Sequence, residues 1–170
     1  MRFASLLPSV LVVPALMAAT PDVATAGPPW ISIELPANPY DAASRGAYLL
    51  VHAFHHGTPM NFPVTGRAEG IVKGERKTIT LTFDRTERPG VFALRNQWGV
   101  EGEWTLVLSV SQGKGDGNAA TALVQISEGQ VFSVQVPTEQ RGEWKVPRAV
   151  TLAEVEATLR DRPTRVAARR

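Results

Sequence analysis

The sequence predicts an all-β fold: an antiparallel β-sandwich of about eight short strands, followed by one short C-terminal helix. Between Trp30 and Val136, short apolar runs alternate with polar residues at a period of two, and glycine and proline separate the runs. A helical period appears only near the end of the chain. This number and spacing of strands is typical of an immunoglobulin-like sandwich.

Four segments show the strand pattern clearly. Residues 78–83 place apolar side chains at odd positions and threonine at even positions, which predicts a strand with one wet face. Residues 103–110 and 131–136 repeat the alternation, whereas residues 46–54 are apolar on both faces, as in a central strand. The side chains expected to face the core in the second and third segments are Trp104, Leu106, Leu108, Val110, Phe132, Val134 and Val136.

Turn and cap residues place the boundaries of these elements. Lys73-Gly74 and Glu128-Gly129 each separate two strand-like runs and predict hairpins, and residues 113–118 form a glycine-rich loop between two more. Near the C-terminus Thr151 can cap a helix, with Glu154 three residues on, and the helix stops before Pro163. Leu152, Val155 and Leu159 would share its apolar face.

The N-terminal 26 residues read as a secretory signal peptide. Arg2 precedes an uncharged, mostly apolar stretch, and Ala24-Thr25-Ala26 presents the small residues that a signal peptidase recognises. We therefore expect a periplasmic or secreted protein that begins at Gly27 and is not inserted in the membrane after cleavage; the alternative is an uncleaved anchor. The expected organisation is a signal peptide (1–26), a sandwich (27–140), and a C-terminal helix with a basic tail (141–170).

Composition excludes several classes of function. The chain has no cysteine, so disulfides, thiolate metal sites and a lipid anchor on cysteine are ruled out. The net charge of +2 comes from five arginines in residues 160–170, which leaves the body slightly acidic and without a basic face for nucleic acid. The tail is either solvated or contacts anionic lipid or an acidic partner.

Enzyme motifs are missing or isolated. Neither H-E-x-x-H nor G-x-S-x-G occurs, and Ser111 to Lys114 matches S-x-x-K only within a glycine-rich loop. Asp116 and Asn118 have the first spacing of a calcium loop, but no further acidic ligand follows in register. Trp98 and Trp144 are the aromatic residues that could be exposed, although packing is the expected role of each. The sequence therefore predicts a binding protein and not an enzyme.

The candidate site is a histidine cluster. His52, His55 and His56 are the three histidines of the chain, and Met60 follows closely. Imidazoles with a thioether suit copper, and imidazoles alone suit copper, nickel or zinc. On a continuous strand, however, His52 and His56 would be about 13 Å apart and His55 would face the other way. One shared ion therefore requires the strand to end near Phe54; otherwise the histidines only end a strand.

Three segments resemble the small periplasmic YtkA-like and FixH-like domains, and the CopC-like copper-binding sandwiches. They are residues 46–52 (GAYLLVH), 89–94 (PGVFAL) and 102–108 (GEWTLVL), and the similarity would cover about residues 30–112. The resemblance implies an immunoglobulin-like fold and a possible copper site. The methionine-rich stretch and N-terminal histidine of such proteins are absent, so a copper role would depend on His52, His55, His56 and Met60.

The sequence thus predicts an exported binding module with one of two partners. The first hypothesis is a transition metal, with the three histidines as ligands and Met60 as a soft auxiliary ligand. The second is another envelope protein, bound through a sheet face or an edge strand, with the histidines incidental.

Overall fold

The computed structural model describes residues 27–35, 38, 40–113 and 118–160. The expected signal peptide (1–26), the basic tail beyond Arg160 and most of the glycine-rich loop lie outside these residues. Within them, no helix is both long and apolar enough to cross a membrane.

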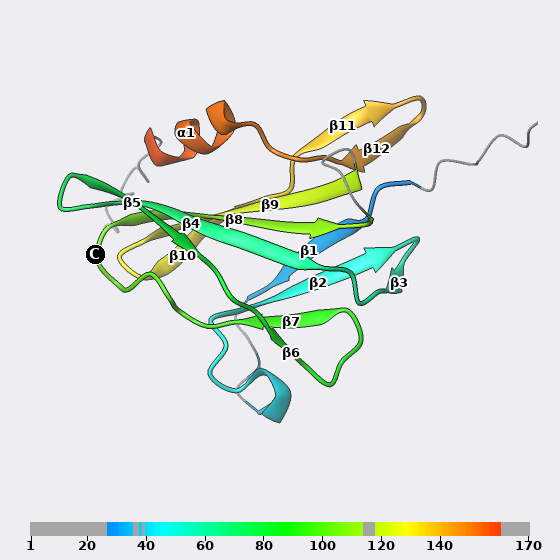
Figure 1. Cartoon of the computed structure of the whole chain (residues 1–170), viewed down its shortest axis with the longest axis horizontal. Helices are drawn as coiled ribbons and strands as arrows, with labels where there is room; N and C mark the ends of the chain where they lie inside the picture. The colour runs from blue at the N-terminus through cyan, green and yellow to red at the C-terminus, as the bar shows by residue number, and fades with distance from the viewer. Residues whose placement is uncertain (1–26, 36–37, 39, 114–117, 161–170) are drawn as a thin grey trace, which may run out of the picture.

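Two antiparallel sheets form the body of the protein (Figure 1). The first has the order β1-β2-β7-β6, with the short β3 also paired to β2, and the second has the order β10-β9-β8-β4-β5. The strands of the first sheet are β1 (Trp30–Glu34), β2 (Leu49–His55), β3 (Thr58–Pro59), β6 (Asp84–Arg85) and β7 (Val91–Leu94). Those of the second are β4 (Val64–Val72), β5 (Glu75–Thr80), β8 (Glu103–Ser111), β9 (Ala119–Ser127) and β10 (Gln130–Gln135).

A separate hairpin and two helical segments complete the fold. The hairpin consists of β11 (Thr138–Arg141) and β12 (Trp144–Pro147), and the helices are the 3₁₀ turn η1 (Ala42–Ser44) and α1 (Leu152–Arg160). Figure 1 shows α1 above the second sheet and η1 below the first, with the sheets between them. The predicted all-β architecture with one C-terminal helix is confirmed at this level.

One hydrophobic core joins the two sheets. Alternate residues of β8 and β9 pack against alternate residues of β2 and β7, as a period of two requires. The predicted inward positions of residues 103–110 are confirmed, because Trp104, Leu106, Leu108 and Val110 are all buried. With no cysteine to cross-link the chain, this apolar core is its main source of stability.

The central strand of the first sheet is β2, which is covered on both faces. Leu49, Val51 and Ala53 face the shared core, while Leu50 belongs to a second buried cluster with Val91 and Ala93 of β7. The apolar run in residues 46–54 therefore marks a strand that is covered on both faces, as predicted, although the strand itself begins at Leu49.

The chain crosses from one sheet to the other directly after β5. Residues 78–83 alternate as predicted, with Leu81 buried and Ile79 and Phe83 packed against the core. The strand ends at Thr80, however. The chain then leaves the second sheet, and β6, which begins at Asp84, pairs with β7 of the first sheet. The alternation thus predicted the direction of the side chains but not the end of the strand.

Strand β10 departs from its predicted pattern. Val136 packs against the core, but the inward placement of Phe132 and Val134 is wrong, since their side chains are 43% and 41% exposed. The register shifts between Val131 and Ser133, so Val131 packs against the core. Because β10 is an edge strand with a bulge, simple alternation fails there.

Helix α1 covers the outer face of the second sheet. Val155 packs with Val107 and Leu123, and the hydroxyls of Thr105 and Thr158 lie 2.9 Å apart. Val155 and Leu159 are buried as predicted, but Leu152 is 65% exposed. On the same face, burial would raise the pKa of Glu69, yet hydrogen bonds from Thr78, Arg67 and Arg76 outweigh it and lower the pKa.

The predicted helix cap is present. The backbone N–H of Thr151 donates to Glu154 Oε2 at 2.8 Å, and the N–H of Glu154 donates to Thr151 Oγ1 at 3.3 Å. Arg148 donates to both carboxylate oxygens of Glu154. These contacts, with Arg148 the strongest, lower the pKa of Glu154 to about 2.

Two glycines permit close packing that a side chain would prevent. A Cβ on Gly70 would lie 2.2 Å from the indole of Trp104, its cross-strand partner on β8. At Gly90 (φ +69°) a Cβ would lie 2.7 Å from the carbonyl oxygen of Ala53 and 2.8 Å from the nitrogen of Met60.

Gly70→Ala is expected to lower the free energy of unfolding by about 1–3 kcal/mol, because the buried Trp104 ring must shift. Urea denaturation would measure the change. Gly27→Ala is the matched control, since nothing lies within 4 Å of a Cβ at that position. Equal small effects in both variants would contradict the packing argument.

Glu154→Gln is expected to destabilise the protein at neutral pH by about 0.5–1 kcal/mol, because it removes the ion pair with Arg148. The folded-state pKa is depressed from 4.5 to about 2, so this stability is present above pH 4.5 and is lost as the pH falls toward 2. Denaturation curves across that range should therefore converge for wild type and variant. Glu143→Gln, at an exposed hairpin tip, is the control; a difference that persists at pH 2 would refute this account.

Candidate functional site

The histidines lie around the end of β2. The strand runs to His55, and His56 and Gly57 form a two-residue turn into β3, with His55 paired to Thr58. Both turn residues have positive φ, 49° and 77°, as a type I′ hairpin requires. The chain therefore reverses near the predicted point.

His52 lies on the outer face of the first sheet. It is separated from the core side by the alternation of β2, in which Val51 and Ala53 face inward. Its Nε2 is 2.8 Å from Glu34 Oε2, its ring is stacked on Phe54, and its side chain is 14% exposed.

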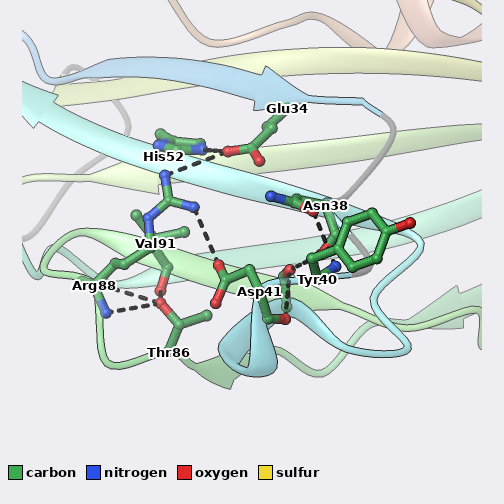
Figure 2. Close-up of polar contacts among 9 residues, drawn as sticks. Glu34, Asn38, Tyr40, Asp41, His52, Thr86, Arg88 and Val91 are labelled. Carbon is green, nitrogen blue, oxygen red and sulfur yellow. Dashed lines mark hydrogen bonds and ion pairs between the residues drawn. The ribbon is translucent and has the colours of Figure 1, made fainter.

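A chain of charged contacts extends from His52 across this face (Figure 2). Arg88 lies between two carboxylates, with Nη2 3.4 Å from Glu34 and Nη1 3.6 Å from Asp41. The backbone N–H of Arg88 also donates to the hydroxyl of Thr86, which anchors the loop before β7. These contacts join Glu34 and Asp41 through Arg88, and they give His52 a structural partner.

The side chains of His55 and His56 lie next to each other at the start of the turn, away from His52. Their ring centroids are 4.2 Å apart with an interplanar angle of 64°. His55 Nε2 is 3.2 Å from the carbonyl oxygen of Gly27. Because a carbonyl can only accept, Nε2 of His55 is the donor in this contact, and in a neutral ring with this tautomer the lone pair is on Nδ1.

Met60 lies beside β2 and directly follows β3. Its backbone N–H donates to the carbonyl of Ala53 at 2.9 Å, and its side chain is 37% exposed. The structure thus brings His55 and His56 together and places His52 on the opposite face. In residues 27–35, 38, 40–113 and 118–160, no set of three or more histidine or carboxylate side chains is arranged to hold a metal ion.

His56, one of the two paired histidines, lines a groove of about 500 Å³. Three distant segments line it: the start of β1, the β2–β3 turn and the β11–β12 hairpin. The groove residues that matter below are Gly27, Trp30, His56, Arg141, Trp144 and Lys145.

The tryptophans divide into buried and exposed pairs. Trp104 and Trp98 are 3% and 5% exposed, and Trp98 packs edge-on against Tyr48, so the expected packing role of Trp98 is confirmed. Trp144 is 75% exposed, so its expected packing role is wrong, and Trp30 is 44% exposed; both line the groove. Tryptophan is enriched at protein interfaces, and two exposed indoles in one groove are typical of a binding surface.

Comparison of the chain with protein-family models, with curated proteins and with solved structures finds no match. The arguments about function therefore rest on the geometry and chemistry of the chain itself.

Sequence reasoning missed the residues that meet the histidines from far away in the chain. Glu34 is 18 residues before His52, and Gly27 is 28 residues before His55. The sequence did not indicate a role for Trp30 or Lys145, because neither belongs to a local motif. The one sequence signal for such a surface site was an aromatic residue next to cationic residues.

A double-mutant cycle on Glu34→Ala and His52→Ala should show a coupling free energy of about 0.5–1.5 kcal/mol, because the contact is direct and partly buried. Urea denaturation at pH 7 would measure it. The pair Glu34→Ala and His56→Ala is the control, since these side chains make no mutual contact among the described residues. Equal coupling in both pairs would show that the Glu34–His52 contact contributes nothing specific.

Proposed function

We propose that this chain is an exported binding module with an immunoglobulin-like sandwich fold that binds a divalent transition-metal ion, copper foremost, at His55 and His56. The observation that carries the proposal is the 4.2 Å separation of the two imidazole rings at the β2–β3 turn. The two packed sheets and the resemblance of three segments to immunoglobulin-like periplasmic domains support the fold, and imidazole ligands suit copper.

The hydrogen bond between His55 and Gly27 supports metal binding. Imidazoles that bind metals commonly donate their second N–H to a carbonyl or carboxylate, which fixes the tautomer and orients the ring. His55 has this arrangement through the carbonyl of Gly27, which leaves Nδ1 for a metal. Two imidazoles with water in the other positions would form an exchangeable site and not a structural one.

The expected cleavage after Ala26 would add a third nitrogen. It would free the α-amine of Gly27, whose carbonyl already contacts His55. Pro28 follows and has no N–H to lose, so coordination could not continue along the backbone beyond the amine. His52 and Met60, the other predicted ligands, fall outside this smaller site.

The second candidate function is protein–protein interaction in the cell envelope. The observation that favours it is the groove with two exposed indoles, which is independent of metal binding except for His56 at its rim.

Titration of copper(II) and zinc(II) into residues 27–170 by calorimetry should show one-to-one binding. His55→Ala and His56→Ala should each weaken it by about tenfold or more, because each removes one of two imidazoles. His52→Ala is the matched control and should leave the affinity unchanged, as should Met60→Leu. Equal losses for His52→Ala and His55→Ala, or no binding at all, would refute the site.

The contribution of the amine can be separated in the same assay. A form with two extra residues before Gly27 should bind more weakly than the form that begins at Gly27, with the histidines intact in both. Equal affinity would restrict the site to the two imidazoles and remove the amine from it.

A further inference from the structure

The outer edge of β12 is an unpaired strand edge that borders the groove. β12 pairs with β11 and with no other strand of the described chain. The hairpin turns at Gly142 and Glu143, with Gly142 at φ 59°, so Arg141 and Trp144 close a two-residue turn. Because hydrogen bonds alternate along an antiparallel pair, the backbone N–H and C=O of the next residue, Lys145, point away from β11.

The backbone groups of Lys145 are therefore open to a new strand. Among the described residues, they form no backbone hydrogen bond outside the hairpin. Three consecutive residues of β12, Trp144 to Val146, line the groove, which means that the edge of the strand, and not one face, borders it. An unpaired edge of this kind can accept an extended peptide as an added strand.

The side chains around this edge are aromatic and cationic. Trp144 and Trp30, both exposed, come from two different strands, β12 and β1. Arg141 and Lys145 supply positive charge, and no carboxylate is among the described residues that line the groove. Arg141 is 2.6 Å from Glu139, whereas Lys145 makes no ion pair with any residue that the structure describes. The free cation of the groove is thus Lys145, within the described part of the chain.

We propose that this groove binds an extended acidic segment of a partner protein, which pairs with β12 at Lys145 and places apolar side chains against Trp30 and Trp144. The charge of the groove selects an acidic partner, and the open strand edge selects a peptide. A sugar chain has no backbone amides to pair with the edge, and a membrane surface does not fill a groove. The inference does not rest on metal binding at His55 and His56, and the peptide is expected to bind the metal-free protein.

The test uses the chain expressed with its own leader and purified in the presence of a chelator. The probe is a fluorescein-labelled eight-residue peptide of alternating glutamate and valine with one central tryptophan, and binding is measured by anisotropy. We expect it to bind about tenfold or more tightly than the same peptide with lysine for glutamate. Methylating the backbone nitrogens of one alternate set of its residues should abolish binding, and methylating the other set should not.

Variants of the protein test the two features of the groove separately. Trp144→Ala and Lys145→Glu should each weaken the binding of the acidic peptide by about tenfold. Tyr40→Ala and Lys77→Glu are the matched controls, because both residues are exposed and lie outside the groove lining. His55→Ala should bind the peptide normally, which separates a failure of this proposal from a failure of the metal site.

Several outcomes would overturn the proposal. They are no binding of the acidic peptide, equal binding of the lysine peptide, no effect of either methylation, or equal losses in Lys145→Glu and Lys77→Glu. Vesicles of phosphatidylcholine with phosphatidylglycerol and a polygalacturonate oligomer are tested in parallel. Binding of either one through Trp144 and Lys145, without binding of the peptide, would replace the peptide by a lipid surface or a sugar acid.

Discussion

Burial of both faces of β2 is the constraint on which the rest of the structure depends. Leu49, Val51 and Ala53 face the core shared with the second sheet, so the intervening side chains must face outward, where Leu50 is equally buried. The register of such a strand cannot slip, because a shift by one residue would exchange the two faces. The same alternation separates His52 from His55, and only the turn at His56 and Gly57 lets a second imidazole reach the side of His55.

Side chains also pack on the outward face of β2, and His52 is one of them. A carboxylate from β1 and another from the segment that follows it converge on Arg88, which comes from the loop before β7. These groups are partly exposed, so each ion pair stabilises the fold only slightly. The burial of Leu50, which packs with Val91 and Ala93 on this side of β2, contributes more than any single charge. A histidine in this setting has the role of a packed, hydrogen-bonded side chain.

The sequence predicted those features of the fold that depend on residues close together in the chain, and it did not predict contacts between distant residues. Alternation gave the correct faces in residues 78–83 and 103–110, and the pair Thr151 and Glu154 gave the helix cap, because these depend on neighbours in the chain. The inward placement of Phe132 failed at a bulge on an edge strand, where one extra residue breaks the period. The β11–β12 hairpin was not foreseen, since its residues are mostly polar and carry no alternation of apolar side chains. The contacts of His52 and His55 join residues 18 and 28 positions apart, and no local pattern indicates them.

The two proposed ligands would meet at one end of the molecule, and their binding would be linked. His56 is one proposed metal ligand and also lines the groove beside Trp30 and Lys145. A divalent cation at His55 and His56 would add positive charge to a groove whose described lining residues include no carboxylate, so an acidic peptide would bind more tightly to the metal-loaded protein. Linkage is reciprocal, and the peptide would then raise the affinity for the metal by the same factor. The reason is geometric: the turn that pairs the two histidines also forms part of the groove that β12 borders.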